Sequence, residues 1–112
     1  MKRIAILGST GSIGRQSLEV VESLRERFAV VALAAGGNLD ELTGQVERHR
    51  PQLVSVADER RADELVVELR GKGIDALPEI QWGAAGLKAV ATHAEADIVV
   101  SAAVGVVGLE AT

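Results

Sequence analysis

A glycine-rich segment near the start of the chain constrains the fold more than any other feature: Gly8-Ser9-Thr10-Gly11-Ser12-Ile13-Gly14. It follows an apolar run, residues 3–7, which predicts a strand buried on both faces, and it leads into a segment with helical spacing that begins near Ser12. Glycine allows backbone N–H groups to approach an anion closely, and a helix N-terminus supplies unpaired N–H donors with a partial positive charge. The strand, the loop and the helix together predict a turn that holds a phosphate.

Strands and helices are predicted to alternate along the chain. Strands are expected at residues 3–7, 28–34, 53–56, 76–78 and 97–102. Helices are expected at 12–27, between the Asn38 cap and Pro51, between the Asp58 cap and Gly71, and at 82–93, where Trp82 is the expected packing anchor. This order is typical of an α/β fold, a Rossmann-like doubly wound parallel sheet of about five strands with helices on both faces. No repeat or linker divides residues 1–112, so one domain is expected.

Composition excludes several classes of function. The chain has no cysteine, which rules out disulfides, thiolate metal sites and a cysteine nucleophile within these residues. Its formal net charge of −4 argues against nucleic acid or an anionic membrane as the main partner. No stretch approaches the roughly 20 apolar residues of a membrane span, and the N-terminus lacks the apolar core of a signal peptide. A cytoplasmic protein is expected, and no catalytic or metal-binding set of residues can be assembled from this sequence.

Three loops follow predicted strands and are expected to meet at one edge of the sheet, where ligands bind in such folds. They are residues 8–14, 36–38 and 102–105. The first loop is expected to bind a pyrophosphate through backbone N–H groups, with the Ser12 hydroxyl as a helix cap. Its residues are Gly8, Thr10, Gly11, Ser12, Ile13 and Gly14. Tight packing of strand against helix, with no ligand, is the plainer alternative.

The end of the second strand indicates which dinucleotide is preferred. Folds that bind NAD usually carry Asp or Glu about 20 residues after the glycine loop, where the acid holds the ribose 2′-hydroxyl. Here that count reaches Ala34, and no acid follows before Asn38. Because a carboxylate would repel a 2′-phosphate, its absence favours NADP over NAD, and Gly36, Gly37 and Asn38 are expected to hold that phosphate. A glycine turn with an asparagine cap is the alternative.

The sequence resembles one enzyme family over its whole length. The segments that carry the resemblance are KRIAILGSTGSIGRQSLEVV, the turn ALAAGGN and the closing ADIVVSAAVGVVGLEAT. They are similar to the NADPH-binding domain of 1-deoxy-D-xylulose 5-phosphate reductoisomerase, an enzyme of non-mevalonate isoprenoid biosynthesis. The resemblance implies a parent enzyme that uses NADPH and a divalent metal, Mg²⁺ or Mn²⁺, to convert 1-deoxy-D-xylulose 5-phosphate to 2-C-methyl-D-erythritol 4-phosphate.

The resemblance also implies roles for single residues. Residues 10–13 would bind the NADPH pyrophosphate, residues 36–38 the 2′-phosphate ribose, and the segment with Ala103 and Gly105 would lie against the nicotinamide half. Many members carry a basic residue where this chain has Gly37. Binding of the 2′-phosphate is therefore expected to be weaker, or to depend on Arg60 or Arg61. The alternative for these two arginines is that they are part of a solvated helix face. A second departure is Ala111, where the family has proline.

Family members are several times longer than this chain, and their metal ligands and substrate-phosphate site lie in the part that this sequence lacks. The chain is therefore expected to bind NADPH without catalysing a reaction by itself. A stand-alone NADP-sensing module and the cofactor domain of a semialdehyde-type dehydrogenase are the alternatives. Exposed sheet edges and apolar patches also predict a homo-oligomer.

Overall fold

The computed structural model describes residues 1–102, which form a single parallel sheet flanked by helices. In chain order the elements are β1 (Lys2–Leu7), α1 (Ser12–Ser23), β2 (Phe28–Ala34), α2 (Leu39–His49), β3 (Leu53–Val56), α3 (Glu59–Gly71), β4 (Glu79–Trp82), α4 (Gly83–Ala91) and β5 (Ile98–Ser101). All strand pairs are parallel, in the order β4-β3-β2-β1-β5. The predicted Rossmann-like architecture is confirmed.

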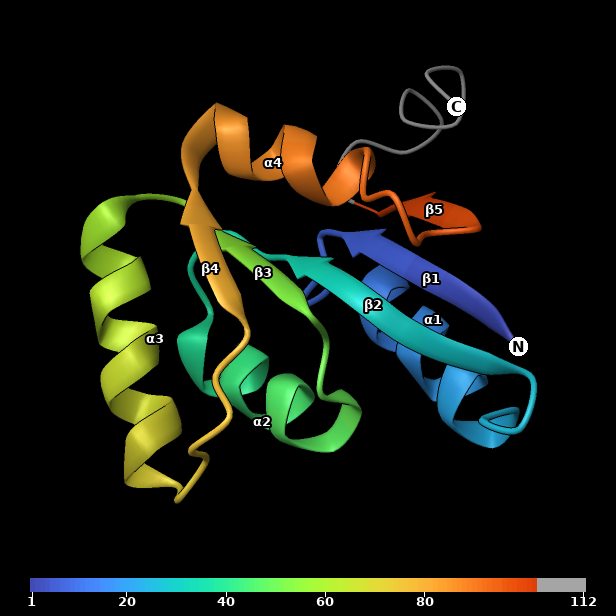
Figure 1. The fold of residues 1–112 in the computed structure, drawn as a ribbon, viewed down its shortest axis with the longest axis horizontal. Coiled ribbons are helices and arrows are strands. Elements are labelled where there is room, and N and C mark those ends of the chain that lie inside the picture. Colours follow the sequence, from blue (N-terminus) through green and yellow to red (C-terminus); the bar gives the residue numbers. More distant parts are fainter. Residues whose placement is uncertain (103–112) are drawn as a thin grey trace.

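The direction of the crossovers decides which face each helix covers. From β1 to β4 the chain moves steadily toward one edge of the sheet, so right-handed crossovers place α1, α2 and α3 on the same face. From β4 it returns past β1 to β5, and the same handedness places α4 on the opposite face (Figure 1). The strand order therefore reverses beside β1, and the crevice at such a reversal is where open α/β sheets bind ligands.

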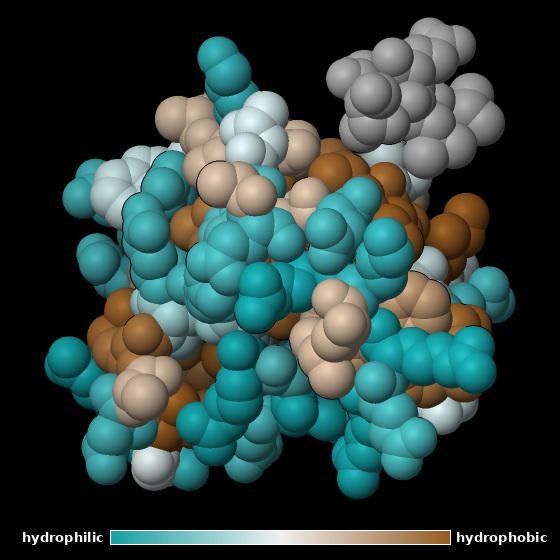
Figure 2. Space-filling model, turned by 45° about the vertical axis from the view of Figure 1, so that its right-hand side comes forward, coloured by the Kyte–Doolittle hydropathy of each residue, from teal (hydrophilic) through white to brown (hydrophobic). Residues whose placement is uncertain are grey.

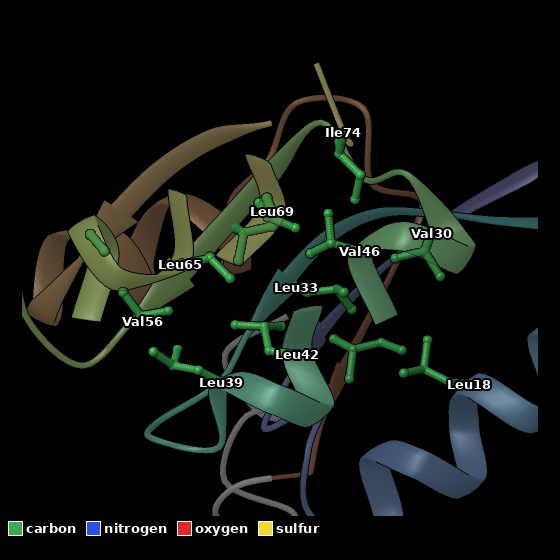
Figure 3. Packing of buried hydrophobic residues seen from close by; sticks show 14 of the residues in the cluster. Leu18, Val30, Leu33, Leu39, Leu42, Val46, Val56, Leu65, Leu69 and Ile74 are labelled. Carbon is green, nitrogen blue, oxygen red and sulfur yellow. The ribbon is translucent and has the colours of Figure 1, made fainter. Parts of the chain in front are cut away.

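The two faces of the sheet are packed with side chains of different size. On the side of α1, α2 and α3, large aliphatic residues pack together, among them Leu33, Leu42, Leu65 and Leu69 (Figure 3). These four side chains and Ile6 are fully buried. Burying each of these side chains contributes roughly 1.5–3 kcal/mol to folding. The three helices on this face hold the loops at the carboxyl edge of the sheet on a rigid support.

On the opposite face the sheet presents three alanines beside the larger Val31 and Leu53, and α4 packs on them. Ala5, Ala32 and Ala34 pack there with Val90 of α4. A β-carbon on Gly86 would overlap Ser55 Oγ of β3 and would lie 3.2 Å from the backbone carbonyl carbon of Gln81, so glycine favours the close approach of α4 at this contact.

Two predicted helix caps are confirmed. Asn38 Oδ1 accepts the N–H of Glu41 at 3.2 Å at the start of α2, and Asp58 Oδ1 accepts the N–H of Arg61 at 2.9 Å at the start of α3. Loss of such a cap costs about 1 kcal/mol. Both caps come shortly after the carboxyl ends of strands, so they fix where the loops after β2 and β3 end.

Three predictions about the elements are wrong. The fourth strand lies at Glu79–Trp82, not at 76–78, because it is an edge strand in the described sheet and its half-exposed sequence gives a weak apolar signal. The first helix ends at Ser23, not near Arg27, since Arg27 N–H bonds to the Leu24 carbonyl in a tight turn into β2. Trp82 is 43% exposed at the end of β4 and anchors no helix in the core.

The surface is largely polar. Hydrophilic side chains cover most of the face seen in Figure 2, and apolar residues form separate patches. Among the large apolar side chains that are exposed are Trp82 and Leu87 on the α4 side and Ile98 on β5. Across residues 1–102, the helices are all too short or too polar to cross a membrane.

Candidate functional site

Main-chain hydrogen bonds fix the shape of the glycine loop that follows β1. The N–H groups of Gly8 and Ser9 both donate to the carbonyl of Ala34, at 2.7 and 3.0 Å, which ties the loop to the end of β2. Gly8 has a φ of 82°, in the left-handed region that favours glycine. Gly11 N–H then donates to the Gly8 carbonyl at 3.1 Å. The loop is therefore rigid before any ligand binds.

Gly14 lets α1 pack directly on this loop. A β-carbon at this position would overlap the Gly8 carbonyl oxygen and would lie 2.7 Å from the Ser9 α-carbon. Because both of these atoms belong to the backbone, no side chain can move aside to make room. Gly14 is thus required by packing, and it brings the first turn of α1 against the loop.

The loop leaves backbone donors unpaired. In the part of the chain that the structure describes, the N–H groups of Thr10, Ser12 and Ile13 have no protein acceptor. Ser12 is not the helix cap that the sequence suggested. The cap position is Gly11, which makes no side-chain bond, and Ser12 is the exposed first residue of α1. Three free donors at a helix N-terminus form a geometry suited to a phosphate.

Gln45 of α2 holds the glycine loop through a side-chain hydrogen bond. The sequence did not predict this role. The side chain of Gln45 is only 5% exposed, and its Nε2 donates to the Ser9 carbonyl at 2.9 Å. The available signal was a polar residue next to Val46 in the buried stripe of an amphipathic helix. A buried amide at such a position requires a partner, and here the partner is the loop.

The turn between β2 and α2 forms the second part of the site. Gly36, Gly37 and Asn38 are exposed, and their backbone N–H groups have no acceptor within residues 1–102. The Ala35 N–H donates to the Ser55 carbonyl at 2.9 Å, which holds the turn beside β3. Since Asn38 caps α2 through Oδ1, its Nδ2 group remains available to a ligand.

A groove of about 280 Å³ connects the two loops. Its lining is mostly apolar and comes from the glycine loop, the β2 and β3 ends and α4, with Gly8, Ala34, Gly36, Val56, Ala57 and Leu87 among its residues. A β-carbon on Gly36 would meet nothing within 4 Å, so this side of the groove is open. A flat, partly apolar group fits between the two loops.

Ion pairs distinguish the arginines near this edge. Arg15 lies 3.5 Å from Glu41, and Arg60, 73% exposed, pairs with Glu64 on the solvated face of α3. Arg61 instead pairs with Asp58, with 2.6 Å between Nη1 and Oδ2. The Arg61 N–H and guanidinium lower the pKa of Asp58, so this carboxylate stays ionised near neutral pH.

Two of the predicted site residues, Ala103 and Gly105, lie outside the described residues. In residues 1–102, no three His, Cys, Asp or Glu side chains come together to hold a metal ion. Glu68 of α3 and Asp40 of α2 form an acidic pair. Partial burial, and then the hydrogen bond to Asp40, raises the pKa of Glu68.

The fold and the two loops define a Rossmann-type domain with its ligand edge at the β1 and β2 ends. A model of the 1-deoxy-D-xylulose 5-phosphate reductoisomerase family matches residues 4–112, and the chain belongs to this family. A relative of that name from Geotalea uraniireducens is 52% identical over the whole chain, and one from Symbiobacterium thermophilum is 50% identical over 99% of it. The chain spans about 28% and 29% of these two relatives.

Solved structures carry the same fold. A DOX-P reductoisomerase in complex with NADPH, fosmidomycin and magnesium matches 97% of the chain with a TM-score of 0.84 and 29% identity. The 1-deoxy-D-xylulose 5-phosphate reductoisomerase from Zymomonas mobilis in complex with NADPH matches 82% of it with a TM-score of 0.72 and 29% identity. The chain covers 26% and 23% of these two proteins.

Proposed function

We propose that this chain is the NADPH-binding domain of a reductoisomerase. The observation that carries the proposal is the set of unpaired N–H groups at Thr10, Ser12 and Ile13, on a loop whose shape Gly14 and Gln45 fix. Relatives in complex with NADPH support it. The acid that usually selects NAD is absent after β2, which supports NADP over NAD.

Each part of the site then receives one part of the cofactor. The glycine loop holds the pyrophosphate, the apolar groove receives the adenine, and Gly36, Gly37 and Asn38 surround the 2′-phosphate ribose. The segment with Ala103 and Gly105 is proposed to contact the nicotinamide half. When bound, NADPH supplies a hydride, while the role of these residues is to bind and orient it.

For the whole protein we propose the family's reaction, from 1-deoxy-D-xylulose 5-phosphate to 2-C-methyl-D-erythritol 4-phosphate, in the cytoplasm. The names of relatives that match 100% and 99% of the chain support this activity. The chain spans about 28% and 29% of these two relatives, and we propose that the residues binding the metal and the substrate belong to the part of the family's length that it does not span. The family match gives no support to a semialdehyde-type dehydrogenase.

Calorimetric titration with NADPH and NADH tests the cofactor assignment. We expect NADPH to bind at least about tenfold more tightly, because one charge-assisted interaction with the 2′-phosphate contributes roughly that factor. Equal affinities would contradict the preference for NADP, and a failure of both nucleotides to bind would contradict the proposal as a whole.

We also propose that the protein self-associates. Trp82 and Ile98 are 43% and 39% exposed, and β4 and β5 are the edge strands of the described sheet. Open edges and exposed apolar side chains favour association with a second copy. Light scattering is expected to give a mass above that of one chain, and a monomer at high concentration would contradict this.

A further inference from the structure

The Arg61 side chain reaches from α3 to the turn that follows β2. Its Nε, Nη2 and Cζ atoms lie 3.5, 3.8 and 4.0 Å from the point where a β-carbon on Gly37 would be. Gly37 therefore has a guanidinium beside it although it carries no side chain of its own. Two segments that are 24 positions apart in the sequence place a cation at this turn.

The orientation of the guanidinium leaves one edge available. Nη1 donates to Asp58 Oδ2 at 2.6 Å, and the Arg61 N–H donates to Asp58 Oδ1 at 2.9 Å. Within residues 1–102, Nε and Nη2 make no hydrogen bond, and these are the atoms that face Gly37. The Nε and Nη2 edge of arginine is a planar fork that binds carboxylate or phosphate through two parallel hydrogen bonds.

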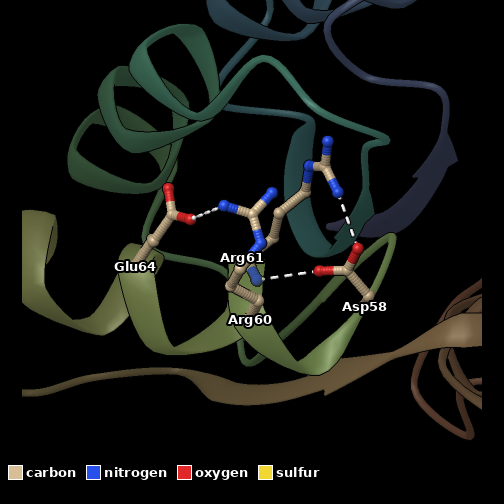
Figure 4. Close-up of polar contacts among 4 residues, drawn as sticks. All are labelled: Asp58, Arg60, Arg61 and Glu64. Atoms are coloured by element: carbon tan, nitrogen blue, oxygen red, sulfur yellow. Dashed lines mark hydrogen bonds and ion pairs between the residues drawn. The ribbon is translucent and has the colours of Figure 1, made fainter.

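Asp58 makes this fork rigid. The side chain of Arg61 is 33% exposed, and its ion pair with Asp58 restricts the rotamers that this side chain can adopt. The neighbouring Arg60 is 73% exposed and turns toward Glu64 on the other side of the helix turn (Figure 4). The two arginines are adjacent in sequence, but the guanidinium of Arg61 lies beside Gly37 and that of Arg60 pairs with Glu64.

We propose that Arg61 binds the 2′-phosphate of NADPH through Nε and Nη2, and that it supplies the cation that position 37 lacks. This inference rests on the proposed function, because it assigns a residue to one group of the proposed cofactor. Asp58 acts as the positioning residue: it holds Nη1, while the edge formed by Nε and Nη2 lies toward Gly37. Asp58 also places one negative charge nearby, and its pair with Nη1 neutralises that charge.

The test compares R61Q with R60Q, which removes an adjacent arginine of the same helix. NADPH and NADH are titrated into each variant and into the unchanged protein. We expect R61Q to weaken NADPH binding by about 10- to 100-fold, the range for a hydrogen-bonded pair of charges, and to leave NADH within about twofold. R60Q is expected to leave both affinities within about twofold, and R61K to recover part of the NADPH affinity because it restores the charge without the fork.

Each result separates the inference from the function it rests on. If the unchanged protein prefers NADPH and R61Q keeps that preference, Arg61 is not the 2′-phosphate ligand, although the cofactor assignment stands. If R61Q weakens NADPH and NADH equally, Arg61 acts only on the structure of the turn, and the inference is overturned. If the unchanged protein binds neither nucleotide, both the proposed function and this inference fail.

Discussion

The two loops at the ligand edge are built in different ways. The loop after β1 is fixed by its own backbone, through Gly8, Gly14 and the bonds to the Ala34 carbonyl, and it offers main-chain donors. The turn after β2 is open and glycine-rich, and the groups that give it chemical character are side chains, Asn38 and the distant Arg61. In the proposed function, the first loop therefore holds the pyrophosphate of either cofactor, whereas the second selects between NADPH and NADH.

The largest expected effect comes from Gly14, which is central to the first loop. G14A places a methyl group on the Gly8 carbonyl, so we expect a loss of more than about 3 kcal/mol in the free energy of unfolding. NADPH and NADH binding should be lost together, since both carry a pyrophosphate. Urea unfolding and calorimetry measure the two effects.

Gly44 provides the matched control for G14A. It lies within α2, and a β-carbon there would meet nothing within 4 Å. G44A is therefore expected to raise the free energy of unfolding by about 0.5–1 kcal/mol, since alanine favours a helix more than glycine does. If G14A were as well tolerated as G44A, the loop would not depend on close packing against α1.

Gln45 gives the next largest effect. Q45M keeps most of the side-chain volume but leaves the Ser9 carbonyl without its donor, which should cost about 1–3 kcal/mol of stability. Both cofactors should bind several-fold more weakly because the loop loses its support. T43V is the control: Thr43 donates within α2 to the Leu39 carbonyl, so its loss should lower stability and spare cofactor affinity. Unchanged affinity in Q45M would show that the loop needs no support from α2.

Asn38 tests the second loop without disturbing the fold. In N38D the carboxylate still caps α2, so the free energy of unfolding should change by less than about 0.5 kcal/mol. The added negative charge should weaken NADPH by roughly tenfold relative to NADH. A ratio of the two affinities that stays constant would place the 2′-phosphate away from this turn.

His49, on the opposite edge of the sheet from the loops, gives the smallest effect. Partial burial lowers the pKa of His49, Glu22 opposes this shift, and Arg48 adds to it. Below about pH 6.5 the unfolded chain then binds more protons than the folded one, so stability is complete above that pH and falls as the pH decreases. Thermal unfolding between pH 5 and 8 should show a shallower slope for H49Q. Cofactor affinity should not follow this slope, and an identical slope in both proteins would contradict the assignment.

The sequence predicted the first loop better than the second for a physical reason. The first loop binds through its backbone, and its shape is encoded locally by the glycine spacing after an apolar run. Its position beside Ala34 follows from the alternation of strands and helices along the chain, which predicts a parallel sheet. Gln45 and Arg61 act across 36 and 24 positions of the chain, and no local pattern contains those contacts. The pattern of apolar residues misplaces edge strand β4 because two of its four side chains face solvent. The sequence also predicts Ser12 as a cap, since serine is common at that position, whereas the cap is Gly11.

Backbone amide NMR of the ¹⁵N-labelled chain during titration with NADPH and with NADH tests the central claim most directly. We predict that both cofactors shift the amides of Thr10, Ser12 and Ile13 by similar amounts. NADPH alone should strongly shift the amides of Gly36, Gly37 and Asn38. Equal shifts at the second loop, or shifts confined to residues outside both loops, would contradict the division between a pyrophosphate loop and a selecting turn.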